Sequence, residues 1–211
     1  MNKQLQLVCK PLFIAGVLAL TCLFLVGAKS WSGNRVSTQG KGNAHGKVIE
    51  KENFPNTPFE LVDLKATGKA VKFGEKFDDD EDWLKKINFK LKNNSDKPIV
   101  YVLVYLHFPE TEFTGMGMTF ELQYGQRPGA KIVTGKPILL TKGDVSSITL
   151  SDSDYDELKR FVENRQSLSS ISKVVINIPT VYFADGTVWS GGVLYQPDST
   201  APGGMRAINN N

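Results

Sequence analysis

Residues 99–108 read IVYVLVYLHF, and this is the most apolar stretch outside the N-terminal segment of the chain. It follows the turn-forming residues NNSDKP at positions 93–98. A short run of β-branched and aromatic residues that begins at a turn is typical of a buried β-strand. Side chains alternate between the two faces of a strand, so we expect the even-numbered residues of this run in a core. The opposite face then carries Tyr101, Leu103, Tyr105 and His107.

On both sides of this strand, the sequence alternates apolar and polar residues in short segments. Ile87, Phe89 and Leu91 alternate with polar residues. We expect further strands at residues 59–64, 119–124, 137–140, 145–150, 174–183 and 187–195. The last two flank Asp185-Gly186, a pair that suits the type I′ turn of a β-hairpin because both of its positions need a positive φ. The pattern predicts a mainly β chain, folded as an antiparallel sandwich of the immunoglobulin or fibronectin type.

One segment, residues 151–167, departs from the β pattern. It places Tyr155, Leu158, Phe161 and Val162 at helical spacing, and its charges change from acidic to basic along its length. These features predict one short amphipathic helix. We expect its apolar stripe to cover the strand face that carries Tyr101, Tyr105 and His107. If the helix lies elsewhere, that face is open and is a candidate site for a partner.

The N-terminal segment has the pattern of an export signal. Lys3 and Lys10 precede an uncharged apolar run over residues 12–28. A basic start followed by such a run is typical of a signal peptide, and the small residues at its end predict cleavage after Ala28. The alternative is an uncleaved membrane anchor at residues 12–28, because about 17–25 apolar residues suffice to span a bilayer. We therefore expect an N-terminal hydrophobic helix and an extracytoplasmic protein, located in the periplasm, at the cell surface or outside the cell.

Composition divides the rest of the chain into three parts. Residues 29–58 are rich in Gly, Ser, Asn and Lys and predict a flexible linker, while residues 196–211 predict a disordered tail. Residues 59–195 have the apolar content of a single globular domain. Both cysteines, Cys9 and Cys22, precede this domain, which excludes disulfides and thiolate chemistry from it. Lipidation at Cys22 is disfavoured because the apolar run continues after it.

The residue types available for catalysis or metal binding are few. The two histidines are His45 in the predicted linker and His107 in the predicted strand, so we expect no histidine metal cluster and no Ser-His-Asp triad. The net charge of +3 comes without a basic stripe, which argues against nucleic-acid binding. Residues 78–82 (DDDED) begin like a calcium-binding loop, but Trp83 and Phe89 stand where that loop needs Gly and Glu. We expect a solvated loop there, and no metal, cofactor or catalytic residue in the chain.

Aromatic side chains supply the remaining candidate site. Trp83 and Trp189, with Tyr182 and Tyr195, are candidates for a platform that stacks on sugar rings. Packing in the core is the alternative for at least one of the two tryptophans. The candidate residues for binding a partner or a sugar are Tyr101, Tyr105, His107 and Trp189.

Four segments of the chain carry a resemblance to other proteins. They are FPETEFTG at 108–115, YGQRPG at 124–129, KRFVENRQ at 159–166 and VYFADGTVWSGG at 181–192. Over residues 59–195 the chain resembles a group of uncharacterised bacterial proteins that join a signal segment to one β-sandwich-like domain. The resemblance implies a fold and an extracytoplasmic location, and it implies no activity.

Together these features predict a non-enzymatic binding or structural module of the cell envelope. Its expected partner is an envelope protein or polysaccharide, and its N-terminal segment contacts the membrane if it is not cleaved. The alternative is a carboxylate-dependent glycan hydrolase, because that chemistry needs only two carboxyl groups at a fixed separation.

Overall fold

The computed structural model describes residues 46–113, 116–130, 136–201 and 203–208. The chain divides into two compact units at Gly40, and every described residue belongs to the second unit. The predicted hydrophobic helix at residues 12–28 and the predicted cleavage position lie outside the described residues. Within the described ranges, no helix has the length and apolarity needed to span a membrane.

The described part of the chain is mainly β with one α-helix, as the alternating pattern predicts. The strands are β1 (Lys47–Lys51), β2 (Phe59–Ala66), β3 (Lys69–Ala70), β4 (Lys76–Phe77), β5 (Asn88–Asn93), β6 (Ile99–Phe113), β7 (Met116–Gly125), β8 (Val145–Thr149), β9 (Lys173–Phe183), β10 (Val188–Ser190), β11 (Val193–Pro197) and β12 (Met205–Ala207). The helix α1 spans Asp152–Glu163, and two 3₁₀ helices span Trp83–Lys86 and Leu168–Ser170.

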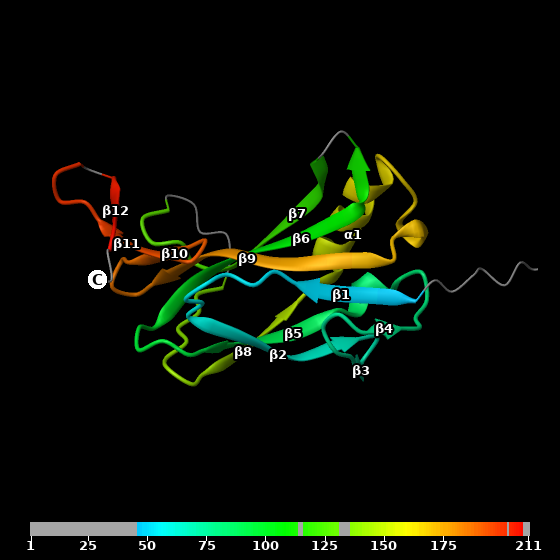
Figure 1. Ribbon diagram of the computed structural model, residues 1–211, viewed down its shortest axis with the longest axis horizontal. Coiled ribbons are helices and arrows are strands. Elements are labelled where there is room, and N and C mark those ends of the chain that lie inside the picture. Colours follow the sequence, from blue (N-terminus) through cyan, green and yellow to red (C-terminus); the bar gives the residue numbers. More distant parts are fainter. Residues whose placement is uncertain (1–45, 114–115, 131–135, 202, 209–211) are drawn as a thin grey trace, which may run out of the picture. The chain divides into compact units, whose positions relative to one another are not determined.

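The strands form two sheets, which Figure 1 shows as separate layers. In the larger sheet of eight strands, β7, β6 and β9 are antiparallel neighbours. The other side of β9 pairs with β1 along one part and with β10 along another, and β1 runs parallel to it. The smaller sheet has the order β3-β2-β5-β8, and its pairs are antiparallel.

Alternate residues of both sheets meet in one hydrophobic core. On β6 the core residues are Val102, Val104, Leu106 and Phe108, which are at most 1% exposed. Burying a side chain of this size stabilises a fold by about 1.5–3 kcal/mol. The even-numbered face of the predicted strand is therefore the core face, except at Val100, which is partly exposed.

Strands lie in both segments that the sequence predicts to be unstructured. β1 falls within residues 29–58, and its Ile49 is fully buried beside β9. β12 falls within residues 196–211 and pairs with β11. β1 is short and mostly polar, and β12 has three residues that are all exposed. Their order therefore comes from pairing with a neighbouring strand and not from an apolar pattern of their own. The ordered region is thus longer than residues 59–195.

The C-terminal hairpin differs in detail from its prediction. β9 and β10 pair on either side of Asp185-Gly186, as expected. Gly186 has a positive φ whereas Asp185 does not, and the amide of Phe183 donates to the carbonyl of Thr187. The loop therefore comprises residues 184–186 instead of a two-residue type I′ turn. The predicted strand at 187–195 is split into β10 and β11 by a pair of glycines with positive φ.

The helix α1 forms where the sequence predicts one, but it covers a different surface. Its N-terminus is capped by Ser151, whose side chain accepts from the amide of Asp154. Its apolar stripe belongs to the core, and Phe161 packs against Phe120 of β7 with 6.0 Å between the ring centres. Phe120 shares the core face with Leu106, its partner on β6. The expectation that α1 covers Tyr101, Tyr105 and His107 is therefore wrong, because buried residues of β7 need this cover.

Candidate functional site

Three of the four predicted site residues lie on the face of the larger sheet that points away from the core, here called the outer face. Tyr101, Tyr105 and His107 alternate along β6 with the core residues. Tyr105 and His107 are half-buried. Asn177 lies beside Tyr105 on β9, and its Nδ2 donates to a carboxylate oxygen of Glu52. The structure thus groups these three residues with polar neighbours.

Tyr101 is the least accessible of the three, at 4% exposed. Its ring packs edge-on against Tyr182 of β9, with 5.6 Å between the ring centres. The guanidinium group of Arg127 lies over the Tyr182 ring at 5.2 Å. Burial, together with the nearby charge of Glu121, raises the pKa of the Tyr101 hydroxyl. Tyr101 therefore supports the sheet and offers little surface to a partner.

His107 is held in place by the neighbouring strand. Its Nδ1 lies 3.1 Å from Oγ1 of Thr119, its partner on β7. Gly117 leaves room for the ring, because a Cβ at that position would lie 2.5 Å from Cε1 of His107. The imidazole is thus fixed against β7 by one hydrogen bond and by the missing side chain.

Trp189 lies on the opposite side of the same sheet from the other three predicted residues. It pairs with Val181 of β9 and is 2% exposed. Phe54 and Phe59 pack edge-on against its ring at 5.7 and 5.6 Å. A ring so enclosed has no free face to stack on a sugar, so Trp189 is not part of a stacking platform.

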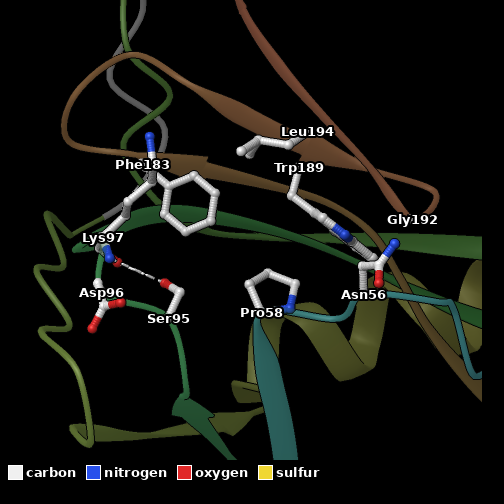
Figure 2. Close-up of a pocket in the computed structure, with 9 residues that line it drawn as sticks. All are labelled: Asn56, Pro58, Ser95, Asp96, Lys97, Phe183, Trp189, Gly192 and Leu194. Atoms are coloured by element: carbon white, nitrogen blue, oxygen red, sulfur yellow. Dashed lines mark hydrogen bonds between the residues drawn. The ribbon is translucent and has the colours of Figure 1, made fainter. Parts of the chain in front are cut away.

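Trp189 instead forms part of the wall of a pocket of about 310 Å³. The pocket is lined by Asn56, Pro58, Ser95, Asp96, Lys97, Phe183, Trp189, Gly192 and Leu194. Figure 2 shows the apolar side chains around the hollow, with Ser95, Asp96 and Lys97 on one side and Asn56 and Gly192 on the other. We call it the Trp189 pocket. An apolar pocket with a few polar groups at its edge is the usual form of a ligand site.

The charged residues at the rim of the Trp189 pocket form ion pairs. Nζ of Lys97 donates to Asp185 at 2.5 Å and to the hydroxyl of Thr187 at 3.1 Å. Partial burial opposes ionisation of Asp185, but the hydrogen bonds from Lys97 and Thr187 outweigh it and hold the pKa of this carboxyl below its usual value. Asp96 accepts a hydrogen bond from Nζ of Lys142 at 2.7 Å, which lowers its pKa.

The indole N–H of Trp189 is buried and has no hydrogen-bond partner among the described residues. Leaving such a donor unpaired costs about 1–3 kcal/mol. Native proteins rarely tolerate this unless the group has a further role or binds water or a ligand. The unpaired donor marks the Trp189 pocket as the strongest candidate site in the described part of the chain.

The residues of the pocket come from several loops. Asn56 and Pro58 precede β2, Ser95 to Lys97 join β5 to β6, and Gly192 joins β10 to β11. Gly192 has a φ of +97°, and a Cβ there would lie 2.6 Å from Cγ of Pro55. No sequence motif connects these loops. Sequence reasoning found Trp189 by residue type alone and missed its neighbours.

The acidic run at residues 78–82 takes part in the fold. A carboxylate oxygen of Asp79 accepts from the hydroxyl of Thr67 at 2.6 Å, and one of Asp82 accepts from the hydroxyl of Tyr155 at 2.6 Å. In the described ranges, no three His, Cys, Asp or Glu side chains are grouped so that they can hold a metal ion.

A second hollow, of about 220 Å³, brings two carboxylates together. Glu121 of β7 and Asp154 of α1 line it with Tyr124, whose hydroxyl donates to the carbonyl of Thr149 at 2.8 Å. Fewer apolar residues line this hollow than line the Trp189 pocket. It is the place at which the predicted alternative, a carboxylate-dependent hydrolase, can be tested.

Comparison of the chain with protein-family models, with curated proteins and with solved structures finds no match.

Proposed function

We propose that this protein is an exported or membrane-anchored, non-enzymatic binding module of the cell envelope. Export is supported by the basic start and apolar run of residues 1–28. Binding is supported by the Trp189 pocket, whose buried indole N–H lacks an acceptor among the residues that the structure describes. That unpaired donor is the observation on which the proposal depends. The expected partner is an envelope polysaccharide or protein.

We also infer that the fold is a sandwich of the immunoglobulin or fibronectin type. The order β2-β5-β8 in one sheet and β7-β6-β9-β10 in the other supports this inference. In such sandwiches the loops gather at the two ends, and loops at one end often form the binding site. The origin of the Trp189 pocket in several loops agrees with this arrangement.

A retention experiment tests the binding function. The full chain, purified with its own N-terminal segment, is immobilised and exposed to envelope polysaccharides and to an envelope extract. We expect a retained polymer or protein that is lost from the variant Leu194→Trp, because a larger ring at this half-buried position fills the pocket. Retention of nothing, or equal retention by the variant, contradicts the proposal.

N-terminal sequencing of the protein from fractionated cells tests the export proposal. A mature chain that starts at Lys29 indicates cleavage after Ala28, and a membrane-bound chain that starts at Met1 indicates an anchor. A chain found only in the cytosol contradicts export in either form.

The hydrolase remains a second candidate, favoured by the hollow that Glu121 and Asp154 share. Release of reducing ends from envelope polysaccharides, abolished by Glu121→Gln, would support it. Equal release by the unaltered chain and by this variant would remove it.

A further inference from the structure

We propose that the Trp189 pocket binds the acetamido group of an N-acetylated amino sugar, whose carbonyl oxygen accepts the hydrogen bond that Nε1 of Trp189 lacks. This inference rests on the proposed binding function and names its ligand class. It is carried by three properties of the pocket: the unpaired donor, the apolar lining and the polar rim.

The unpaired donor requires an acceptor in the ligand. The indole nitrogen can donate but cannot accept, so its complement is a carbonyl or hydroxyl oxygen. Figure 2 draws this nitrogen on the side of the pocket that Asn56 and Gly192 line. The nitrogen itself is buried, so a ligand reaches it only when a side chain at the rim moves, and Asn56 on that side of the pocket is exposed.

The apolar lining selects among ligands that carry an acceptor. Phe183, Leu194 and Pro58 surround the hollow together with the Trp189 ring. A hydroxyl group placed there would leave its own hydrogen unpaired, which costs free energy. An acetamido group places a methyl against this apolar surface and still presents a carbonyl oxygen. It therefore meets both requirements in one small substituent.

The buried ring of Trp189 argues against sugars that lack such a substituent. An aromatic side chain stacks on a sugar ring only through an exposed face. Trp189 is 2% exposed and Phe183 is 1% exposed, so neither presents a free face. Recognition at this pocket has to come from a group that enters it.

The size and rim of the pocket fit one sugar ring better than a stretch of peptide. Its volume of about 310 Å³ lies near the lower end of the range of small-ligand sites, roughly 300–1,000 Å³. At the rim the carboxylate of Asp96 offers an acceptor for the amide N–H or a ring hydroxyl, because its side chain is 88% exposed and only one of its oxygens accepts from Lys142. An extended peptide would need a row of such pockets, as in grooves that bind proline-rich segments.

Calorimetric titration with matched oligosaccharides tests the inference. The full chain is titrated with the β-1,4-linked trimer of N-acetylglucosamine and with cellotriose, which has the same backbone but hydroxyl groups in place of the acetamido groups. We expect the acetylated trimer to bind at least tenfold more tightly. Equal binding of the two trimers, or binding of cellotriose alone, overturns the inference.

Two variants locate the binding at the indole N–H. Trp189→Phe keeps an aromatic ring but removes the donor, and we expect at least a tenfold loss of affinity for the acetylated trimer. Trp83→Phe is the matched control. The indole of Trp83 lies outside the pocket, so the affinity of this variant for the acetylated trimer should be unchanged. Titrations are made at a temperature at which both variants are folded. Unchanged affinity in Trp189→Phe overturns the inference, and if this variant does not fold, Leu194→Trp takes its place.

The outcomes separate this inference from the proposed function. If an envelope polymer is retained through the pocket but the acetylated trimer does not bind, the ligand class is wrong and the binding function stands. Retention of a proline-rich peptide in place of the trimer has the same meaning. If nothing is retained, both fail.

Discussion

The two buried tryptophans of the described region share a residue type and a degree of burial but differ in one bond. Trp83 is fully buried and Trp189 is 2% exposed. Nε1 of Trp83 donates to the carbonyl of Ile171 at 3.2 Å, whereas Nε1 of Trp189 has no partner among the described residues. Burial alone therefore does not distinguish the two tryptophans, whereas the hydrogen bonding of the indole N–H does.

The surroundings of Trp83 are those of a structural residue. Lys47 is 6% exposed, and its Nζ donates to the same carbonyl of Ile171 at 2.9 Å. The ammonium group also lies 5.8 Å from the centre of the Trp83 ring, and Phe77 packs edge-on against that ring at 5.7 Å. The indole N–H and the ammonium group of this cluster each have a hydrogen-bond acceptor in the fold. Around Trp189 the rings of Phe54 and Phe59 give packing without a hydrogen bond.

The largest expected effect tests the Trp83 cluster. Trp83→Phe removes buried volume and a hydrogen bond, so we expect a loss of about 3 kcal/mol in the free energy of unfolding. Urea unfolding followed by circular dichroism measures it. A loss below about 1 kcal/mol would contradict a structural role for the indole N–H of Trp83 and would remove the difference drawn between Trp83 and Trp189.

The next prediction tests how the 3₁₀ helix at Trp83–Lys86 is held to α1. Tyr155→Phe removes the hydrogen bond to Asp82, which precedes Trp83, and we expect a loss of about 1–2 kcal/mol at neutral pH. Burial, and then the hydrogen bond and charge of Asp82, raises the pKa of Tyr155 above its usual value of 10.0. The folded state therefore holds this proton more tightly than the unfolded state, and stability falls as the pH rises above about 10.

Urea midpoints of both chains at pH 7 and at pH values above 10 check this dependence. Tyr124, whose pKa is also raised by burial, lowers the stability of both chains at high pH. The variant should nevertheless lose less than the unaltered chain, so the gap between them narrows. A constant gap would show that the Tyr155 hydroxyl does not titrate differently on folding.

A third prediction concerns the stability of Trp189→Phe. The smaller ring loses packing against Phe54 and Phe59, but the substitution also removes a donor that has no partner in the described part of the chain. We expect a net loss of about 1 kcal/mol, well below that of Trp83→Phe. The same urea measurement compares the two variants directly. Equal losses would mean that the N–H of Trp189 is satisfied in solution.

The strands were the part of the fold that the sequence predicted best. β5 alternates apolar and polar residues because one of its faces is buried, and β6 and β9 are rich in β-branched and aromatic residues. Both patterns are local in the sequence. β1 and β12 have little such pattern, because their partners on β9 and β11 supply the order. The predicted position of α1 was wrong because it, too, depends on residues that are distant in the sequence. An apolar stripe indicates that a helix packs on something, and only the arrangement of the sheets decides on which surface.

The candidate site was harder to predict than the strands. Tyr101, Tyr105 and His107 were found together because they alternate on one strand, which fixes their common face. Trp189 was grouped with them by residue type, although its pairing with Val181 puts it on the core side. The rim residue Lys97 gave no signal, because its role depends on Asp185, which lies far away in the sequence.

The smallest expected effect tests the rim of the Trp189 pocket. Asp185→Asn removes the charge that pairs with Lys97 but keeps an oxygen for Thr187. The carboxyl is about half exposed, so solvent weakens the pair, and we expect a loss of roughly 0.5 kcal/mol or less at pH 7. The lowered pKa of Asp185 means that the contribution is present above the usual value of 3.8 and disappears as the pH falls through the folded value.

Urea midpoints at pH 7 and pH 3 check this, and the gap between the two chains should shrink at the lower pH. The same variant sharpens the comparison of the two tryptophans. Because Lys97 loses a fixed partner at the rim while Trp189 keeps its surroundings, the affinity for the acetylated trimer should change by less than it does in Trp189→Phe. A larger loss of affinity in Asp185→Asn than in Trp189→Phe would mean that the charged rim contributes more to binding than the buried indole does.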